Sequence, residues 1–258
     1  MGQRALERFR LLWRIPVYFC GAAVLAFAWF ATWPLGALVP AVRRRMRHVT
    51  MTGWGRWTLW CFAIRLERVG VLPKRGVLLV ANHVSYVDIF VLAASADVVF
   101  VSMHELRDWP LFGVMARSLG TVFIDRERKR ELVAVNRDLA AWIERGYTVV
   151  LFPEGAHSHG HSVQPFRPSL FEPAAAAGIE VACATIHFAT LAGDLPASRV
   201  VPWVREPFLV HAARLLSRRR IDARITFHPE LERCADRKEL ARRVHARVAS
   251  AFVPLADS

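Results

Sequence analysis

The sequence predicts an α/β fold with an apolar helical segment in front of it. After Gly70, short apolar runs alternate with longer stretches of helical spacing, the pattern of a β-sheet with flanking helices. Before Gly70, positions 15–42 carry no charged side chain, a length that suits a membrane-associated helix. The 258 residues are enough for one sizeable α/β domain with an appendage. We therefore expect a membrane-anchoring segment at 1–68 and a second domain at 69–258.

The composition favours a membrane surface as partner. Net charge is +13 with only three lysines, so nearly all the positive charge is arginine. Strongly basic chains bind nucleic acid or anionic membranes. Hydrophobic residues make up 54% of the chain and six of the nine tryptophans lie in the first 60 residues, which favours membrane over nucleic acid. A GC-rich coding sequence would also raise the arginine content. Four scattered cysteines without a CxxC pair suggest thiols in a reducing compartment.

The charge-free stretch at 15–42 predicts a bent membrane anchor. Pro34 and Pro40 would interrupt a single long helix, and the 17 residues between Pro16 and Pro34 are the lower limit for a span. Arginines lie on both sides of the stretch, so the positive-inside rule holds both ends in the cytosol. We expect a monotopic helical hairpin, with 51–66 as its second arm, and a catalytic domain on the cytosolic face of the cytoplasmic membrane. An ordinary core-packing helix is the alternative for that arm.

The elements of the α/β domain follow from the alternation of apolar runs and helical spacing. We predict strands at 77–81, 98–102, 121–124, 148–152, 181–188 and 223–227. We predict helices at 87–94, 111–119, 130–145, 170–177, 210–218 and 237–252. Asp236 is a plausible N-cap for the last helix.

His83 and Asp88 are the candidate catalytic residues. They follow the apolar run 76–81 directly, so a buried strand would deliver an imidazole to the edge of the sheet with a carboxylate close behind. Histidine titrates near neutral pH and can take a proton from a hydroxyl. A carboxylate on the second ring nitrogen fixes the tautomer and stabilises the imidazolium. The alternative is a capping turn with a solvated aspartate.

Two further predicted strands end in polar residues that could share a cleft with His83. Asp125 and Arg126 follow one strand, and Glu154 and Gly155 follow the next. Ligands of open α/β sheets lie beyond the carboxyl ends of strands. Arginine pairs with phosphate, and glycine permits close approach of a backbone. In isolation, the stretch that begins at Arg126 could equally be a solvated helix start, and Glu154-Gly155 a plain turn.

These three motifs, in this order and spacing, resemble the glycerolipid acyltransferase family, which includes the 1-acyl-sn-glycerol-3-phosphate acyltransferases. The resemblance extends over about residues 76–188 and rests on Asn82-His83 to Asp88, Phe123 to Arg126, and Phe152 to Gly155. It implies a mixed sheet flanked by helices and an N-terminal membrane-docking hairpin.

The resemblance also implies the chemistry. His83 would be the general base that deprotonates the acceptor hydroxyl, and Asp88 would orient it. The acyl donor would be acyl-CoA or acyl-carrier protein, with no further cofactor and no metal. Asp125, Arg126, Glu154 and Gly155 would hold the polar head of a lysophospholipid, most simply 1-acyl-sn-glycerol-3-phosphate. His157 and Arg167 complete the expected substrate-binding set.

Two departures from the family pattern point to a different lysolipid as the acceptor of the acyl group. His157 stands where the third motif usually has an arginine that helps to bind phosphate, and the fourth motif reads Val181-Ala182-Cys183-Ala184-Thr185-Ile186. The stretches 107–113 and 165–171 look more like lyso-ornithine lipid acyltransferases, whose acceptor carries a carboxylate and an amine. Lyso-ornithine lipid O-acyl transfer is therefore the alternative function.

Other classes remain open at this stage. One is a non-catalytic membrane-surface protein that binds anionic lipid, against which an intact His83 and Asp88 argue. A basic nucleic-acid-binding module fits poorly with the apolar N-terminus. His157, His159 and His161 alternate as a metal site could, although the glycine and serines among them suggest a polar loop. The histidines at 104, 187, 211 and 228 are expected to be structural.

Overall fold

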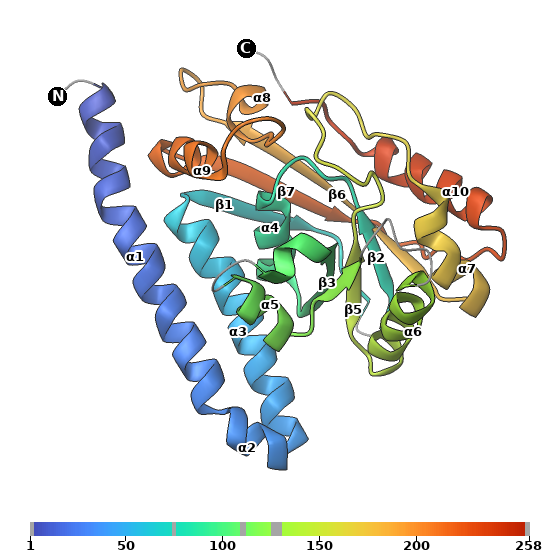
Figure 1. Ribbon diagram of the computed structural model, residues 1–258. Helices are drawn as coiled ribbons and strands as arrows, with labels where there is room; N and C mark the ends of the chain where they lie inside the picture. Colours follow the sequence, from blue (N-terminus) through green and yellow to red (C-terminus); the bar gives the residue numbers. More distant parts are fainter. Residues whose placement is uncertain (1–2, 74–75, 109–111, 125–130, 256–258) are drawn as a thin grey trace.

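A mixed β-sheet forms the centre of the molecule (Figure 1). The computed structural model describes residues 3–73, 76–108, 112–124 and 131–255. Within these residues the strand order is β1-β7-β6-β2-β5-β3-β4. Strand β6 pairs in parallel with β2 and antiparallel with β7, and β7 pairs in parallel with β1. The sheet is therefore mixed, as predicted. The strands are β1 (Ile64–Val69), β2 (Leu78–Ala81), β3 (Val98–Met103), β4 (Val122–Ile124), β5 (Thr148–Leu151), β6 (Val181–Thr190) and β7 (Ile221–Phe227).

Helices cover both faces of this sheet and bury its alternating side chains (Figure 1). Leu79 and Ala81 of β2 face one core with α3 (Pro40–Cys61), α4 (Val87–Ser95) and α9 (Phe208–Ser217). Leu78 and Val80 face a second core with α6 (Glu131–Glu144), α7 (Glu172–Ala177) and α10 (Arg237–Ser250). The remaining helices are α1 (Gln3–Ala31), α2 (Trp33–Leu38), α5 (Phe112–Ser118), α8 (Ala197–Val200) and the 3₁₀ turns η1 (His104–Asp108) and η2 (Pro168–Phe171).

All six predicted strands and all six predicted helices of the α/β domain have counterparts. Asp236 is confirmed as the N-cap of α10, because its carboxylate accepts hydrogen bonds from the amides of Lys238 and Glu239 at 2.7 and 2.9 Å. Residues 111 and 130, the predicted starts of two helices, lie outside the described part of the chain.

The helix predicted at 51–66 was wrong at both ends. It begins earlier, at Pro40, and stops at Cys61, after which Ala63 takes a left-handed φ of 51°. Residues Ile64–Val69 form β1, which pairs with β7 from Ile64↔Ile221 onward. The predicted boundary between 68 and 69 therefore falls inside β1.

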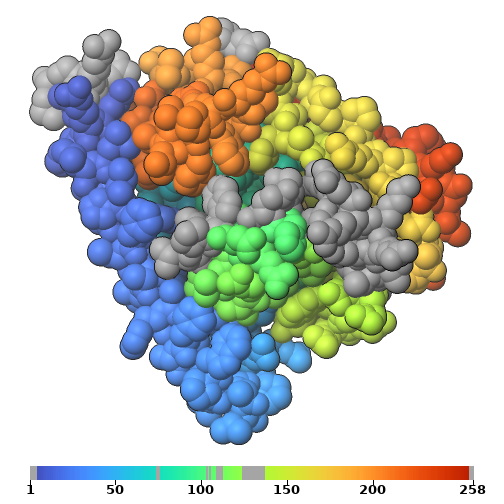
Figure 2. Space-filling model, viewed as in Figure 1, coloured from blue at the N-terminus to red at the C-terminus, as the bar shows by residue number. Residues whose placement is uncertain are grey.

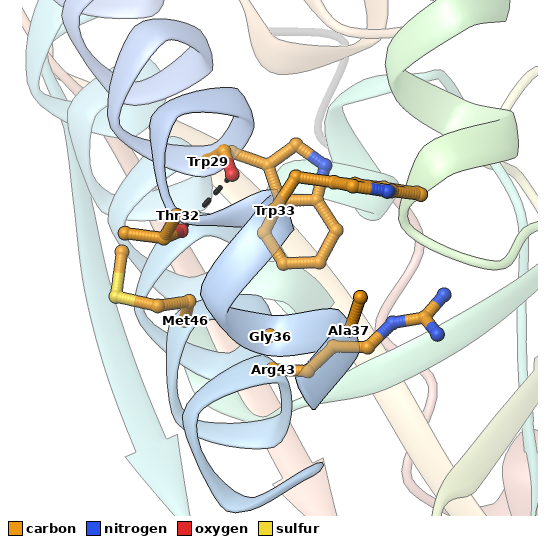
Figure 3. Close-up of a pocket in the computed structure, with 7 residues that line it drawn as sticks. All are labelled: Trp29, Thr32, Trp33, Gly36, Ala37, Arg43 and Met46. Atoms are coloured by element: carbon orange, nitrogen blue, oxygen red, sulfur yellow. Dashed lines mark hydrogen bonds between the residues drawn. The ribbon is translucent and has the colours of Figure 1, made fainter. Parts of the chain in front are cut away.

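The predicted N-terminal hairpin is present, and two of its prolines mark its turns. Pro34 lies in the first turn of α2 and Pro40 begins α3. Backbone amides in the first turn of a helix make no intrahelical hydrogen bond, so proline is tolerated there. At the break between α1 and α2, the Thr32 hydroxyl donates to carbonyls of the preceding turn at 2.9 and 3.0 Å. The guanidinium of Arg43 lies 5.2 Å from the Trp33 ring and closes the tip of the hairpin (Figure 3).

Helix α1 turns an apolar face outward while both of its ends are bonded to the α/β domain. Near its start, Arg14 donates to the carbonyl of Leu216 at 2.6 Å. Near its end, the Trp29 indole donates to the Ser118 hydroxyl at 3.0 Å. Residues 5–31 are long and apolar enough to cross a membrane. Its exposed large side chains include Leu12, Ile15, Phe19, Val24, Phe27 and Phe30.

Candidate active site

Asn82 fixes the path of the chain where β2 ends. Its side-chain amide donates to the carbonyl of Ile186 at 2.9 Å, and its side-chain oxygen accepts from the Ile186 amide at 2.7 Å. The side chain thus continues the pairing of β2 with β6 after the strand has stopped. This anchors the first residue of the loop that carries His83.

His83 and Asp88 meet in the turn between β2 and α4, as predicted. One oxygen of Asp88 (Oδ2) lies 2.9 Å from His83 Nδ1 and accepts from the amides of Val84 and Ser85 at 2.7 and 3.0 Å. Asp88 is fully buried in the first turn of α4, where the helix dipole favours a negative charge. A proton on Nδ1 is therefore held toward the carboxylate, which leaves Nε2 of His83 as the basic nitrogen.

Glu154 binds the backbone of the same turn. One carboxylate oxygen accepts from the His83 amide at 2.6 Å and the other accepts from the Gln164 amide at 3.0 Å. Burial raises the pKa of this carboxyl to about 7. Glu154 thus ties the end of β5 to the catalytic turn through backbone amides, which places it as a support for His83. Its predicted role as a ligand of the headgroup stays a prediction.

Aromatic rings enclose the His83 imidazole. The Phe152 ring stacks on it with centroids 3.9 Å apart and planes 12° apart, and the His157 ring lies 4.3 Å away. His157 also contacts Trp203, at 5.2 Å. Burial, together with the neighbouring imidazoles of His83 and His211, lowers the pKa of His157 to about 3. At neutral pH the position where the family motif has an arginine therefore carries no charge.

Gly155 and Arg167, both predicted for the substrate site, lie against each other. Gly155 has a left-handed φ of 83°, and a Cβ atom added to it would lie 2.6 Å from Arg167 Nε. A side chain at this position would therefore displace the guanidinium from where it lies. The Arg167 side chain is exposed, so it can meet an anion from solvent. Asp125 and Arg126, the remaining predicted headgroup ligands, lie outside the described residues.

Three residues beside the catalytic turn were not predicted as part of the site. The Tyr86 hydroxyl bonds to His211 Nδ1 at 2.9 Å, and His211 Nε2 donates to the Val201 carbonyl at 3.1 Å. The Trp203 amide donates to the Val84 carbonyl at 3.3 Å. Tyr86 lies inside the first motif, but its partner is 125 positions away, and no local pattern joins the two. The expectation that His211 is structural fits its complete burial.

The three alternating histidines do not gather around one point. His159 and His161 lie with ring centroids 6.3 Å apart, while His157 packs toward His83. Within the part of the chain that the structure describes, no group of three or more His, Cys, Asp or Glu residues has the arrangement of a metal site.

Comparison with known proteins identifies similar sequences and folds. Residues 63–187 match the family model described as Acyltransferase. A lyso-ornithine lipid O-acyltransferase of Rhizobium meliloti is 34% identical over 209 residues, 76% of this chain and 72% of that protein. A 1-acyl-sn-glycerol-3-phosphate acyltransferase of Neisseria gonorrhoeae is 34% identical over 146 residues, 57% of each chain. The crystal structure of the 1-acyl-sn-glycerophosphate (LPA) acyltransferase PlsC from Thermotoga maritima has the same fold, with a TM-score of 0.66, 20% identity, and coverage of 97% of this chain and 99% of that one.

Proposed function

Since the chain belongs to the glycerolipid acyltransferase family, we propose that it transfers a fatty acyl group from a thioester to the free hydroxyl of a lysophospholipid. The thioester is acyl-CoA or acyl-carrier protein, and the first-choice acceptor is 1-acyl-sn-glycerol-3-phosphate, which gives phosphatidate. The observation that carries this proposal is the His83–Asp88 pair at the carboxyl end of β2, with Nε2 of His83 as its basic nitrogen.

The chemistry follows from that geometry. Nε2 of His83 takes the proton of the acceptor hydroxyl as the oxygen attacks the thioester carbonyl. The buried carboxylate of Asp88 stabilises the imidazolium that forms. When the tetrahedral intermediate collapses, the C–S bond breaks and the imidazolium returns its proton to the departing sulfur. An ester oxygen thus replaces the thioester sulfur without an acyl-enzyme, and we propose that no cofactor or metal takes part because a thioester is already activated.

The two candidate acceptors differ in the charge that their headgroups present. The exposed guanidinium of Arg167 beside Gly155, and Arg126 as predicted from the sequence, favour the phosphate of lysophosphatidate. The uncharged ring of His157 favours the second candidate, lyso-ornithine lipid, because the third motif lacks its phosphate-binding arginine. Relatives with that name also match this chain over most of their length.

Membrane association belongs to the same proposal. The outward apolar face of α1 would lie in the bilayer, with the arginines near its start and at the hairpin tip against lipid phosphates. Because α1 is bonded to the α/β domain at both ends, it would lie in the plane of the membrane. We place the catalytic domain on the cytosolic face of the cytoplasmic membrane, where both basic flanks satisfy the positive-inside rule.

The decisive experiment is acyl transfer by the purified protein in detergent micelles. Lysophosphatidate and lyso-ornithine lipid are offered in parallel, each with palmitoyl-CoA and with an acyl-carrier-protein donor. Turnover of lysophosphatidate supports the first acceptor, and turnover of lyso-ornithine lipid alone replaces it with the second.

The matched variant is His83→Ala, which should lose acyl transfer by at least about a thousandfold because it removes the proposed general base. Its binding to lipid vesicles should be unchanged, because His83 lies away from α1. Unchanged turnover by His83→Ala would remove His83 from the mechanism. Absence of turnover in the wild type with intact vesicle binding would favour a non-catalytic lipid-binding protein.

A further inference from the structure

A second apolar surface lies outside α1, around the start of α9. Leu209 and Val210 are 77% and 56% exposed, while His211 and Leu215 of the same helix are fully buried. The exposed large apolar side chains of this surface, which we call the α9 surface, are Leu195, Val204, Leu209 and Val210. All four fall within residues 195–210, and exposed apolar side chains gathered in one stretch of chain are a candidate contact with another apolar phase.

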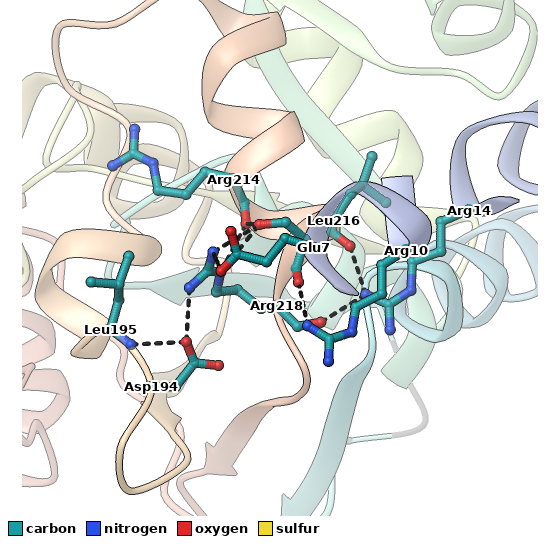
Figure 4. A network of polar contacts seen from close by, with 9 residues as sticks. Glu7, Arg10, Arg14, Asp194, Leu195, Arg214, Leu216 and Arg218 are labelled. Atoms are coloured by element: carbon teal, nitrogen blue, oxygen red, sulfur yellow. Dashed lines mark hydrogen bonds and ion pairs between the residues drawn. The ribbon is translucent and has the colours of Figure 1, made fainter. Parts of the chain in front are cut away.

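The C-terminal end of α9 is bonded to α1. The last carbonyls of α9 and the residue after it accept hydrogen bonds from α1, from Arg14 at 2.6 and 2.8 Å and from Arg10 at 3.0 Å. Arg218 joins the same contact through Glu7 at 2.9 Å and Asp194 at 2.8 Å (Figure 4). In the space-filling view α9 and the residues before it (orange) lie directly beside α1 (blue) on one face (Figure 2).

The positive charge of residues 191–220 favours an anionic partner. Residues 191–220 contain six arginines and two acids. Both acids are already paired, Asp194 with Arg218 and Glu206 with Arg214. The side chains of Arg199, Arg205 and Arg219, in the same stretch of chain, are exposed. Apolar side chains bordered by arginines match the interface of an anionic bilayer, whose phosphates lie just above its acyl chains.

The surface borders the catalytic turn. Phe208, the first residue of α9, has its ring centroid 5.1 Å from that of Tyr86, and His211 bonds to the Tyr86 hydroxyl. Tyr86 lies between His83 and Asp88 in sequence. Leu209 and Val210 directly follow Phe208 in α9. A bilayer in contact with these two residues would therefore lie close to the catalytic turn.

We propose that the α9 surface is a second membrane-contacting surface, inserted into the same anionic leaflet as α1, along which the lysolipid passes from the bilayer to His83. The proposal rests on the proposed membrane-associated acyltransferase function and adds to it a route for the acceptor. The proposed occupant of the α9 surface is a lipid bilayer. An acidic protein such as an acyl-carrier protein is the competing occupant, and the experiment below distinguishes the two.

The test compares two double variants of the full-length protein. Leu209→Gln/Val210→Gln alters the α9 surface. Val71→Gln/Val253→Gln is the control, because these valines are 77% and 54% exposed and lie outside that surface. Binding is measured by flotation with vesicles of phosphatidylglycerol and phosphatidylcholine, and turnover with long-chain lysolipid in those vesicles and with a short-chain, monomeric lysolipid in solution.

We expect the α9 variant to bind vesicles about tenfold more weakly and to lose turnover on vesicles, while it keeps turnover of the soluble acceptor. The control should match the wild type in every assay. Equal behaviour of the two variants on vesicles would overturn the proposal. So would unchanged vesicle binding with reduced turnover from the acyl-carrier-protein donor alone, which would assign the surface to that protein. A wild type that does not bind vesicles would instead refute the proposed membrane association.

A second measurement reports insertion directly. In a Cys20→Ser/Cys234→Ser background, an environment-sensitive fluorophore is attached through Val210→Cys or, as control, Val253→Cys. The remaining thiols are buried, which raises the pKa of Cys61 to about 11 and that of Cys183 to about 12, so they react slowly. Vesicles should shift the emission of the Val210 label to the blue and leave the control label unchanged. No shift at Val210 would contradict insertion.

Discussion

One oxygen of Asp88 accepts three hydrogen bonds, from the ring of His83 and from two backbone amides of the catalytic turn. Asp88→Asn keeps the size of the side chain but removes the charge that stabilises the imidazolium. We expect kcat to fall about a thousandfold with little change in KM, because the acceptor does not contact this buried group. Steady-state kinetics in detergent micelles measures this, and a fall of less than about tenfold would assign Asp88 to the fold of the turn alone.

Glu154 gives the protein a stability that depends on pH. Burial raises the pKa of its carboxyl from 4.5 to about 7, so between these values the folded state keeps a proton that the unfolded state has released. The free energy of unfolding should therefore fall by about 3 kcal/mol as the pH rises through this range. The difference between wild type and Glu154→Gln isolates this group. In urea denaturation it should favour the wild type more at pH 5 than at pH 7.5, and a difference independent of pH would contradict the raised pKa.

The residue scale also shows why part of the site could be predicted from sequence. His83 and Asp88 are five positions apart, and the turn that joins them is specified locally by the end of β2 and the start of α4. Tyr86 and His211 meet only because α9 packs on α4's side of the sheet, so their contact depends on the tertiary fold. The uncharged state of His157 is likewise a consequence of its burial against the rings of His83 and Trp203, which come from two separate segments.

At the element scale, the crossing of α3 and α4 depends on one glycine. A Cβ atom on Gly55 would lie 2.4 Å from the backbone nitrogen of Ala94, so Gly55→Ala must push the two helices apart. We expect it to lower the free energy of unfolding by about 2 kcal/mol and to reduce turnover, because α4 carries Asp88. Gly53→Ala in the same helix is the control.

A Cβ on Gly53 would meet only the side chain of Leu25, at 3.3 Å, so helix propensity should dominate there. Gly53→Ala should be neutral or stabilising by about 0.5 kcal/mol. Thermal denaturation in detergent micelles compares the two variants. Equal destabilisation by both would contradict the role of the close α3–α4 crossing.

Two features explain why β1 was missed while the other strands were found. Most of the other strands are runs of buried apolar side chains, whereas in β1 only Ile64 is buried and the sequence Ile-Arg-Leu-Glu-Arg-Val gives a weak apolar signal. The helix before it ends at Cys61 and is followed by Ala63 in a left-handed conformation, without the glycine that usually marks such an end. The predicted helix at 51–66 was therefore extended past the end of α3 into the first residues of β1.

At the scale of the whole molecule, the bonds from α1 to the α/β domain lead us to expect that α1 lies in the plane of a membrane. A helix that lies in the plane keeps Arg8, near its start, and Arg44, beyond the hairpin tip, on the same side. With Cys20 and Cys234 replaced by serine, Arg8→Cys and Arg44→Cys should both resist a membrane-impermeant maleimide in intact spheroplasts. Both should react in inverted membrane vesicles. Opposite labelling of the two positions would mean that α1 spans the bilayer.

The hydrogen bond from Arg14 to Leu216 joins residues 202 positions apart, and this has a consequence for the order of folding. During synthesis α1 leaves the ribosome long before α9 exists, so its domain-facing arginines have no carbonyls to bond and its apolar face has no cover. A bilayer is available from the start. We therefore expect the nascent helix to settle on lipid first, and the finished domain to close onto a helix that is already in place.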